Sequence, residues 1–236
     1  MALPEVDSTN AEGFRRGGGP AWILAGFQTA GRGRRARPWV SPPGNFHATL
    51  VLHPTEAAEF VALRSFIAAI ALRDAFVSLT GLPDAFQLKW PNDVLLHGGK
   101  VAGILLESTG LTTPAATLCI GIGVNLIAAP AAAQVEPGAV PPVSLLADTG
   151  KRLTPEAFLA ALAPAYARWE ATLTTHGFAP IRAEWLSHAA RLGEVIRART
   201  GEASRQGVFE TIDPRGNLIL RMPEGSVAIP AAEVFF

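Results

Sequence analysis

Hydrophobic residues alternate with polar ones in some segments of the chain and recur at helical spacing in others. The segment 46–52, FHATLVL, has the period of two that is typical of a half-buried strand. Between residues 56 and 80, apolar residues instead recur at spacings of three and four, and Gly81 with Pro83 ends the run. We therefore predict a strand followed by a long helix.

The same criteria predict further strands and helices. Strands are predicted at 21–30, 86–93, 94–109 and 116–127. The last of these is apolar on both faces, which favours a central position in a sheet. A second helix is predicted from Thr154 as N-cap and Pro155 at the first helical position, with Pro164 kinking or splitting it. A third helix is predicted around residues 179–190.

The pattern changes near Leu192, where short alternating strands are separated by the turns TGEA, DPRGN and PEGS. Helices and strands are mixed before this point, and only strands follow it. We therefore predict an α+β fold in two domains. Residues 1–190 would form a mixed β-sheet flanked by helices, and residues 191–236 a small C-terminal β-barrel.

Charge and cysteine content limit the classes of partner. The chain has 20 basic and 20 acidic residues, a formal net charge of zero, and 49% hydrophobic residues. Zero net charge argues against a long nucleic acid or an anionic membrane held by bulk electrostatics, so any anion must be recognised locally. The single cysteine, Cys119, lies in an apolar run and is predicted to be a buried thiol. This usage suits a reducing compartment, and we expect a cytoplasmic protein.

Targeting and membrane-spanning signals are not expected. The N-terminal stretch MALPEVDSTN has neither a basic nor an apolar segment, which argues against a signal peptide. No run of about 18 uninterrupted apolar residues exists, so we predict no membrane span.

Positive charge is concentrated in residues 28–45, QTAGRGRRARPWVSPPGN. Four arginines lie within six positions: Arg32, Arg34, Arg35 and Arg37. Their guanidinium groups match phosphate and carboxylate oxygens, and Gly31 and Gly33 let backbone N–H groups approach an anion. Because like charges repel, we expect the loop to be mobile until an anion orders it over the ligand. The alternative is a solvated loop whose arginines pair with scattered carboxylates.

Three other motifs carry polar chemistry. DSTN, at 7–10, either caps a helix or offers hydroxyl and amide groups to a small polar ligand. In KWPNDV, Lys89 ends a strand before a proline turn; taken alone, an ordinary edge-strand lysine is favoured. In GGKVAGILLE, Lys100 precedes a strand that contains Gly103, and a strand-interior glycine often marks a close approach.

Together these motifs resemble the catalytic domain of biotin protein ligases. STN, QTAGRGRR.R.W.SP.GN, KWPND, GGK.AGILLE and GIGVN follow in the order and at the approximate spacing of that family. The resemblance spans residues 5–190, and the β-rich remainder resembles the family's small C-terminal barrel. It implies the class II synthetase-like fold of the biotin and lipoate ligases.

The resemblance also implies a reaction. The family joins biotin to ATP, giving biotinyl-5′-AMP and pyrophosphate, and then transfers the biotinyl group to one lysine of a carrier domain in a biotin-dependent carboxylase. A carboxylate and a phosphate must meet, so fixed cations aimed at the developing charge are the main route to rate. The implied ligands are biotin, ATP and Mg²⁺, and the implied partner is a biotin carboxyl carrier protein.

The resemblance assigns roles to individual residues. Lys89 would be the catalytic lysine, and Arg32 and Arg34 would belong to the loop that closes over the ligands. The residues expected at biotin are Ser8, Thr9, Asn10, Gln28, Gly31, Arg32, Gly33, Arg34, Lys89, Gly103 and Leu105. The residues expected at the nucleotide are Arg34, Arg35, Arg37, Trp39, Asn92, Lys100 and Asn125. Asp93 is the candidate ligand for Mg²⁺.

The chain departs from the family pattern at three positions. Ala36 stands where glycine is usual, and alanine is penalised at positive φ. Pro38 restricts Arg37 to extended conformations, so we expect closure of the loop to be altered. His47 replaces a residue that is commonly aromatic, and we interpret it as a half-buried strand residue rather than a catalytic base.

Two other functions and two questions of assembly are left open. A lipoate or octanoate ligase or transferase would share the lysine but not usually GRGRR.R.W or the barrel. A non-catalytic sensor of biotin or of an adenylate would not need Lys89, Arg32 and Arg34 together. Because DSTN begins at residue 7, we expect a short form without the N-terminal DNA-binding domain of some members, and no DNA binding. An edge strand could pair two chains into a homodimer.

Overall fold

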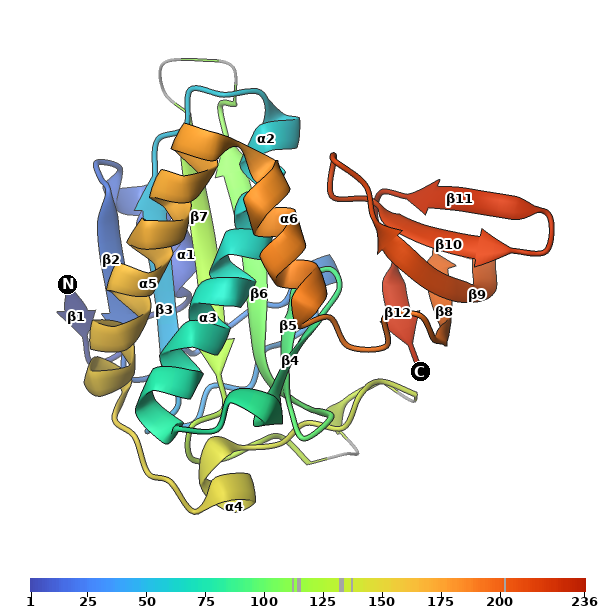
Figure 1. Ribbon diagram of the computed structural model, residues 1–236. Coiled ribbons are helices and arrows are strands. Elements are labelled where there is room, and N and C mark those ends of the chain that lie inside the picture. Colours follow the sequence, from blue (N-terminus) through green and yellow to red (C-terminus); the bar gives the residue numbers. More distant parts are fainter. Residues whose placement is uncertain (112, 114–115, 132–133, 137, 202) are drawn as a thin grey trace.

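The computed structural model describes the chain except for residues 112, 114–115, 132–133, 137 and 202, and its strands form two sheets (Figure 1). The larger sheet comprises β1 (Ala2–Leu3), β2 (Ala21–Ala25), β3 (Phe46–Leu52), β4 (Phe86–Lys89), β5 (Asp93–Leu96), β6 (Gly99–Thr109) and β7 (Thr117–Val124). Their order across the sheet is β1-β2-β3-β7-β6-β5-β4. The predicted mixed sheet is confirmed, because β1 runs parallel to β2 while the other neighbours are antiparallel.

Helices cover both faces of this sheet. The α-helices of the described chain are α1 (Thr9–Arg16), α2 (Ala58–Ala62), α3 (Arg64–Thr80), α4 (Leu145–Thr149), α5 (Pro155–His176) and α6 (Phe178–Ser187). Helices α3, α5 and α6 lie over one face, and α1 lies behind the opposite face (Figure 1). The even positions of β3, such as Phe46 and Leu50, join the core under α3 and α5, so the odd positions face α1 and the site described below.

Two predicted helices differ in detail from the structure. The predicted helix at 56–80 is two helices, because Leu63 N bonds to Phe60 O and Phe66 N to Leu63 O in three-residue turns at the junction. Pro164 lies inside α5 and does not split it. The predicted N-cap is confirmed, since the Thr154 hydroxyl accepts the Ala157 N–H at 3.2 Å.

The second sheet contains the C-terminal strands. They are β8 (Val195–Thr200), β9 (Ala203–Ile212), β10 (Leu218–Met222), β11 (Gly225–Ile229) and β12 (Glu233–Phe235), in the order β11-β10-β9-β8-β12. All neighbouring pairs are antiparallel. The predicted barrel is not closed, because β11 and β12 are the two edges of the sheet and share no ladder in the described part of the chain.

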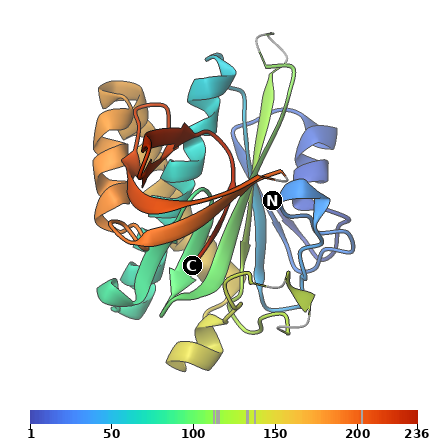
Figure 2. The same ribbon diagram turned by 90° about the vertical axis from the view of Figure 1, so that its right-hand side faces the viewer.

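The second sheet, which lies in front of the rest of the molecule in Figure 2, is attached through contacts with the segment at the end of β4. The Trp90 indole N–H donates to Gly216 O at 3.0 Å, and a β-carbon at Gly216 would lie 2.9 Å from the Phe66 ring. Leu88 and Ala190 also share a backbone hydrogen bond of 2.8 Å. The turn at 213–217 is therefore seated against the segment that carries Lys89 and Trp90.

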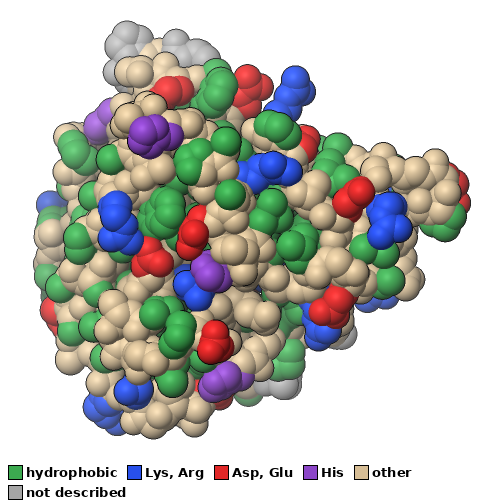
Figure 3. All heavy atoms as spheres, viewed as in Figure 1, with side chains coloured by type: hydrophobic (Ala, Val, Ile, Leu, Met, Phe, Trp, Pro, Cys, Tyr) green, Lys and Arg blue, Asp and Glu red, His purple; other side chains and the backbone are tan. Residues whose placement is uncertain are grey.

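The surface is mixed in charge. On the face shown in Figure 3, Lys and Arg side chains are interspersed with Asp and Glu side chains. No helix of the described residues combines the length and apolar character needed to cross a membrane.

Candidate active site

A cavity of about 380 Å³ lies on the α1 side of the larger sheet, between the arginine-rich loop and strands β5, β6 and β7. Its wall is completed by the loop before α4 and by strand β12 from the second sheet. Strands β5 to β7 are hydrogen-bonded neighbours, so the floor is a rigid surface on which side chains keep fixed positions.

The arginine-rich loop folds back on itself as a short hairpin. Trp39 N donates to Gly31 O at 2.9 Å, and Gly33 N donates to Arg37 O at 2.7 Å. At the tip, Arg35 and Ala36 have φ angles of 57° and 56°, the left-handed region that favours glycine. The departure from glycine at Ala36 therefore falls at a position where the backbone needs positive φ.

The loop arginines pair with carboxylates that surround the cavity. Arg35 and Arg37 both pair with Glu233 of β12, and Arg37 also reaches Glu136 at 2.8 Å. Arg34 donates to Ala232 O at 3.3 Å, and burial lowers its pKa. The second sheet thus holds the tip of the loop in place through charged contacts.

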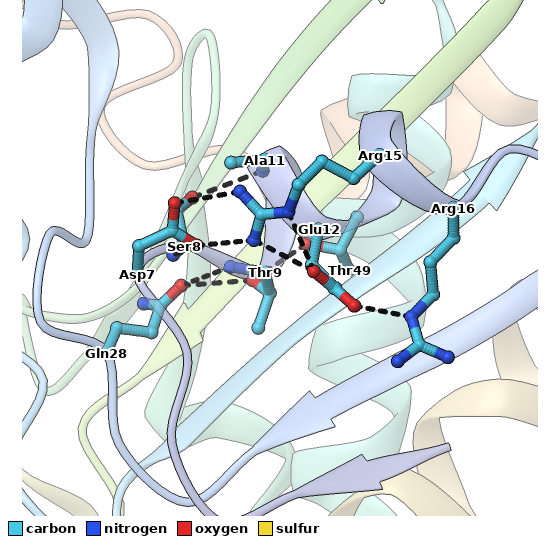
Figure 4. A network of polar contacts seen from close by, with 9 residues as sticks. All are labelled: Asp7, Ser8, Thr9, Ala11, Glu12, Arg15, Arg16, Gln28 and Thr49. Carbon is cyan, nitrogen blue, oxygen red and sulfur yellow. Dashed lines mark hydrogen bonds and ion pairs between the residues drawn. The ribbon is translucent and has the colours of Figure 1, made fainter.

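A chain of hydroxyl and amide groups forms the end of the cavity next to α1 (Figure 4). Ser8 caps α1, and Thr9 donates through its hydroxyl to Gln28 Oε1 at 3.1 Å. Thr49 of β3 lies within hydrogen-bond distance of Thr9 Oγ1, at 2.8 Å, and of Asn10 Oδ1, at 2.6 Å. These hydroxyl and amide groups present both donors and acceptors to a ligand that is itself a donor and an acceptor.

Two lysines share one buried carboxylate at the other end. Lys100 Nζ lies 2.7 Å from Asp93 Oδ1, and Lys89 Nζ lies 3.6 Å from Asp93 Oδ2. Burial lowers the pKa of Lys89, and Asp93 only partly opposes that effect. Burial alone would raise the pKa of Asp93, but Lys100 and Lys89 outweigh it and lower that pKa. The cluster places a net positive charge beside Arg34, where two anions could be held together.

Glycines on neighbouring strands make room for Trp39. A β-carbon at Gly123 would lie 2.3 Å from Trp39 Cε2, and one at Gly103 would lie 3.1 Å from Trp39 Cζ3. Lys100 Nζ lies 5.6 Å from the centre of the same ring. The Trp39 indole therefore rests on the sheet surface next to the lysine pair.

The structure brings most of the residues expected from the sequence to this cavity. Those on its wall are Ser8, Thr9, Asn10, Gln28, Arg32, Gly33, Arg34, Arg37, Trp39, Lys89, Asn92, Asp93, Lys100, Gly103, Leu105 and Asn125. Gly31 and Arg35 do not line it. Gly31 instead packs against the loop backbone, since a β-carbon there would lie 2.7 Å from Trp39 O.

Sequence reasoning missed several wall residues. Gly121 and Gly123 in CIGIGVN could have been found from their alternation along an apolar strand. Glu136 and Glu233 carry no local signal, because they reach the loop only through the fold.

Two single residues were interpreted from the sequence as parts of the core. His47 is fully buried rather than half-buried, because the segment after Trp39 covers it and Pro42 O lies 3.4 Å from its Nε2. Burial lowers the pKa of His47 to about 4. The predicted burial of Cys119 is confirmed, and burial raises the pKa of its thiol to about 12.

The polar atoms left without protein partners indicate what the cavity could hold. Among the described residues, Asn125 Oδ1 and the Trp39 indole N–H are buried and unpaired, and both belong to the cavity wall. One is an acceptor and the other a donor, as a heterocyclic base requires. Within the described part of the chain, no three His, Cys, Asp or Glu side chains are arranged to hold a metal ion.

Asp93, the candidate metal ligand, is a poor fit for Mg²⁺. Each of its oxygens faces an ammonium group, so its charge is already compensated.

Two family descriptions match the chain. Residues 8–125 match the Biotin/lipoate A/B protein ligase family, and residues 192–236 match the Biotin protein ligase C terminal domain. The matched segments contain the cavity floor, the arginine-rich loop and strand β12.

Individual relatives are similar over the whole chain. A biotin–[acetyl-CoA-carboxylase] ligase of Paracoccus denitrificans is 57% identical over 99% of both chains. A bifunctional ligase/repressor of Escherichia coli is 31% identical over 92% of this chain and 68% of its own length. Among solved structures, a biotin protein ligase from Aquifex aeolicus in complex with biotin and ATP superposes with a TM-score of 0.87 at 25% identity, covering 99% of this chain and 96% of that one.

Proposed function

The chain belongs to the biotin protein ligase family, and we propose that it activates biotin with ATP and then transfers the biotinyl group to a lysine of a carrier domain. The observation that carries this proposal is the division of the cavity. Neutral donors and acceptors from α1 and β2–β3 lie at one end, and Lys89, Lys100 and Arg34 lie at the other. A ligand with a polar ring system and a carboxylate fits that division.

The biotin end would hold the fused ureido ring. A ureido group has two N–H donors and one carbonyl acceptor, and Ser8, Thr9, Asn10 and Gln28 supply complementary groups. Leu105 and the open floor at Gly103 would lie along the apolar part of the ligand.

The cationic end would hold the reacting groups. The biotin carboxylate attacks the α-phosphorus of ATP, the bond to the β-phosphate oxygen breaks, and pyrophosphate leaves with the electron pair. Lys89 and Arg34 would offset the repulsion between carboxylate and phosphate and stabilise the charge that grows on the phosphate oxygens. In the second step, the carrier lysine amine attacks the carbonyl carbon of the mixed anhydride, AMP leaves, and the amine loses its proton.

The nucleotide would lie between the arginine-rich loop and the loop before α4. Trp39 offers a ring surface, and the unpaired Asn125 Oδ1 offers an acceptor to an amino or hydroxyl group. Arg37 is tied to Glu136 and Glu233 without an added ligand. Arg35 contributes through Glu233 rather than from the cavity wall.

We also propose that Mg²⁺ is bound through the phosphates of ATP rather than by Asp93. Asp93 would instead hold the side chains of Lys89 and Lys100 in fixed positions, since both ammonium groups lie against its carboxylate. Mg²⁺ commonly keeps several waters and binds through substrate phosphates, so this arrangement needs no dedicated protein cage.

The two proposed domains contribute different parts of the cavity. We propose residues 1–190 as the catalytic domain and residues 191–236 as a second domain that closes the nucleotide end through Ala232 and Glu233. The acceptor is proposed to be the biotin carboxyl carrier protein of a carboxylase. The cytoplasmic location, the absence of DNA binding and the homodimer stay predictions.

ATP–pyrophosphate exchange tests the proposal without the acceptor protein. Biotin, lipoate and octanoate are supplied in turn with ATP and Mg²⁺. Exchange that depends on biotin alone is expected. Exchange with lipoate or octanoate would identify the sister activity, and tight biotin binding without exchange would identify a sensor.

A further inference from the structure

Glu107 lies on β6 and does not line the cavity, yet it contacts two residues that do. Its Oε2 accepts the Asn10 Nδ2–H at 2.8 Å and an Arg32 N–H at 3.2 Å. Glu107 is the last residue of the motif GGKVAGILLE, but neither the motif nor the family resemblance assigns a role to its carboxylate. It is the point where the polar end of the cavity meets the arginine-rich loop.

The chemistry of Glu107 fixes which way the Asn10 amide points. An ionised carboxylate only accepts hydrogen bonds, so only the NH₂ end of Asn10 can face it. The other Nδ2 contact, to Leu105 O at 3.4 Å, is also to an acceptor. Asn10 Oδ1 must then face Thr49, whose hydroxyl donates to it at 2.6 Å. A flipped amide would set Oδ1 against the Glu107 carboxylate, and two acceptors cannot form a hydrogen bond.

The orientation of the Asn10 amide also determines which hydrogen bond the Thr49 hydroxyl can donate. Because the Thr49 hydroxyl has one proton and uses it for Asn10, it cannot also donate to Thr9 across their 2.8 Å contact. The Thr9 hydroxyl donates to Gln28 Oε1 at 3.1 Å. Gln28 follows, with its Nε2 donating to Ser41 Oγ at 3.1 Å (Figure 4 shows Thr9, Thr49 and Gln28). One carboxylate therefore determines the direction of the hydrogen bonds of Asn10 and Thr49 at this end of the cavity.

We infer that Glu107 is a positioning residue for biotin, which presets the Asn10 amide and anchors Arg32 before the ligand arrives. This inference rests on the proposed function, because it assigns the polar end to the ureido ring. Preset acceptors favour binding, since the ligand does not have to reorient them.

Of the two contacts that Glu107 makes, the one with Asn10 contributes more to positioning the biotin site than the one with Arg32. The Arg32 and Glu107 side chains are 38% and 31% exposed, and exposed ion pairs contribute little. Asn10 is only 3% exposed, and a β-carbon at Gly121 would lie 2.5 Å from its Oδ1. A buried amide in the wrong orientation has no solvent to repair its hydrogen bonds.

The test exchanges the two side-chain types. Asn10→Asp alone sets two carboxylates against each other, and the KM for biotin in ATP–pyrophosphate exchange should rise at least about tenfold. When Asn10→Asp is combined with Glu107→Gln, the amide at position 107 donates to the carboxylate at position 10 and accepts from Arg32, while that carboxylate still accepts from Thr49. The double variant should recover at least about fivefold of that loss, and the KM for ATP should stay within about twofold throughout.

Several outcomes would overturn the inference. Glu107→Gln is also measured alone. The inference is wrong if the rise in biotin KM of the double variant equals the product of the rises in Asn10→Asp and Glu107→Gln, because that result means that the two residues act independently. Another such outcome is an unchanged biotin KM in Asn10→Asp, and a third is an equal rise in the KM values for ATP and biotin. Glu12→Gln is the matched control, since Glu12 pairs only with Arg15 and Arg16 on α1 in the described structure, and it should leave both KM values unchanged. If the unmodified protein shows no biotin-dependent exchange, the proposed function fails and not this inference alone.

Discussion

The Trp39 indole lies directly over Gly123, so that a β-carbon at position 123 would be 2.3 Å from Cε2 and 2.5 Å from Nε1. Two residues earlier on the same face of β7, Gly121 likewise leaves space for the Asn10 side chain, because a β-carbon there would lie 2.5 Å from Asn10 Oδ1. The glycine spacing in CIGIGVN therefore serves two neighbouring parts of one cavity. Trp39 belongs to the proposed nucleotide end and Asn10 to the proposed biotin end.

A pair of alanine substitutions should separate these two ends. Gly123→Ala should displace Trp39 and raise the KM for ATP by about tenfold, with a smaller effect on biotin. Gly121→Ala should displace Asn10 and raise the KM for biotin by a similar factor. Steady-state exchange kinetics with each substrate varied in turn provide the measurement. The assignment of the two ends is wrong if both variants change the same KM.

Replacement of Lys89 should remove most of the activity. Lys89→Met deletes a buried positive charge next to the proposed phosphate position, and kcat for exchange should fall about 10²-fold or more. Lys151→Met, at an exposed position outside the cavity, is the control. Turnover that survives Lys89→Met almost unchanged would refute the role of this lysine.

The pH profile should report the same lysine. Because burial lowers the pKa of Lys89, its charge is lost at a lower pH than for an ordinary lysine. Lysine is charged below its pKa, so exchange by the unmodified protein should decline on the alkaline side. Lys89→Arg keeps its charge at high pH, and the remaining activity of that variant should lack this decline. An identical alkaline limb in both proteins would assign the decline to another group.

The ion pairs of Glu233 should hold the loop before any ligand binds. Glu233→Gln removes the shared partner of Arg35, Arg37 and Arg199, each pair being worth up to about 1 kcal/mol. Trypsin should then cleave the loop after Arg34 or Arg35 several times faster, and biotin with ATP should restore protection. Glu210→Gln, on β9 with a serine partner, should not change the rate. Equal cleavage rates in all three proteins would show that these pairs do not restrain the loop.

The sequence predicted those parts of the fold that depend on local patterns. Alternation gave the strands, Thr154 with Pro155 gave the start of α5, and the ordered motifs gave most of the cavity wall. Each of these signals lies within a few residues of the structure it specifies.

The missed features depend on long-range contacts. Glu107, Glu136 and Glu233 are ordinary acidic residues in the sequence, and they gain roles only because β6, the loop before α4 and β12 meet the arginine-rich loop. The predicted barrel is open because β12 pairs with β8, which lies far from it in the sequence, rather than with the neighbouring strand β11. His47 is different, because the contact that covers it comes from Pro42, only five residues earlier, where the chain folds back over β3.

Ala36 offers a way to test strain in the loop. Its φ of 56° costs alanine roughly 1 kcal/mol relative to glycine. Ala36→Gly should relieve that cost and bind biotin and ATP together up to about fivefold more tightly, as measured by calorimetry. Arg35→Gly relieves a similar angle but loses the pair with Glu233, so it should show no such gain. Weaker binding by Ala36→Gly would mean that added freedom of the open loop outweighs the strain.

His47 should make the protein sensitive to mild acid. Burial lowers the pKa of His47 to about 4 from an ordinary value near 6.5. Between these two pH values, His47 is protonated in the unfolded chain and neutral in the folded chain. The free energy of unfolding should therefore fall as the pH drops from 6.5 towards 4, by up to about 3 kcal/mol from this residue. Above pH 6.5 both states are neutral at His47, and the contribution disappears.

His47→Phe isolates this effect. Among the residues that the structure describes, Nδ1 of His47 has no partner and Nε2 contacts only Pro42 O. A ring of similar shape without a titrating group should therefore cost little at pH 7. Urea unfolding at pH 7, 5.5 and 4.5 should give nearly equal stabilities for the two proteins at pH 7 and a shallower acid decline for the variant. Parallel declines would place the acid sensitivity elsewhere, whereas a large loss at pH 7 would show that the contact with Pro42 O is itself needed for stability.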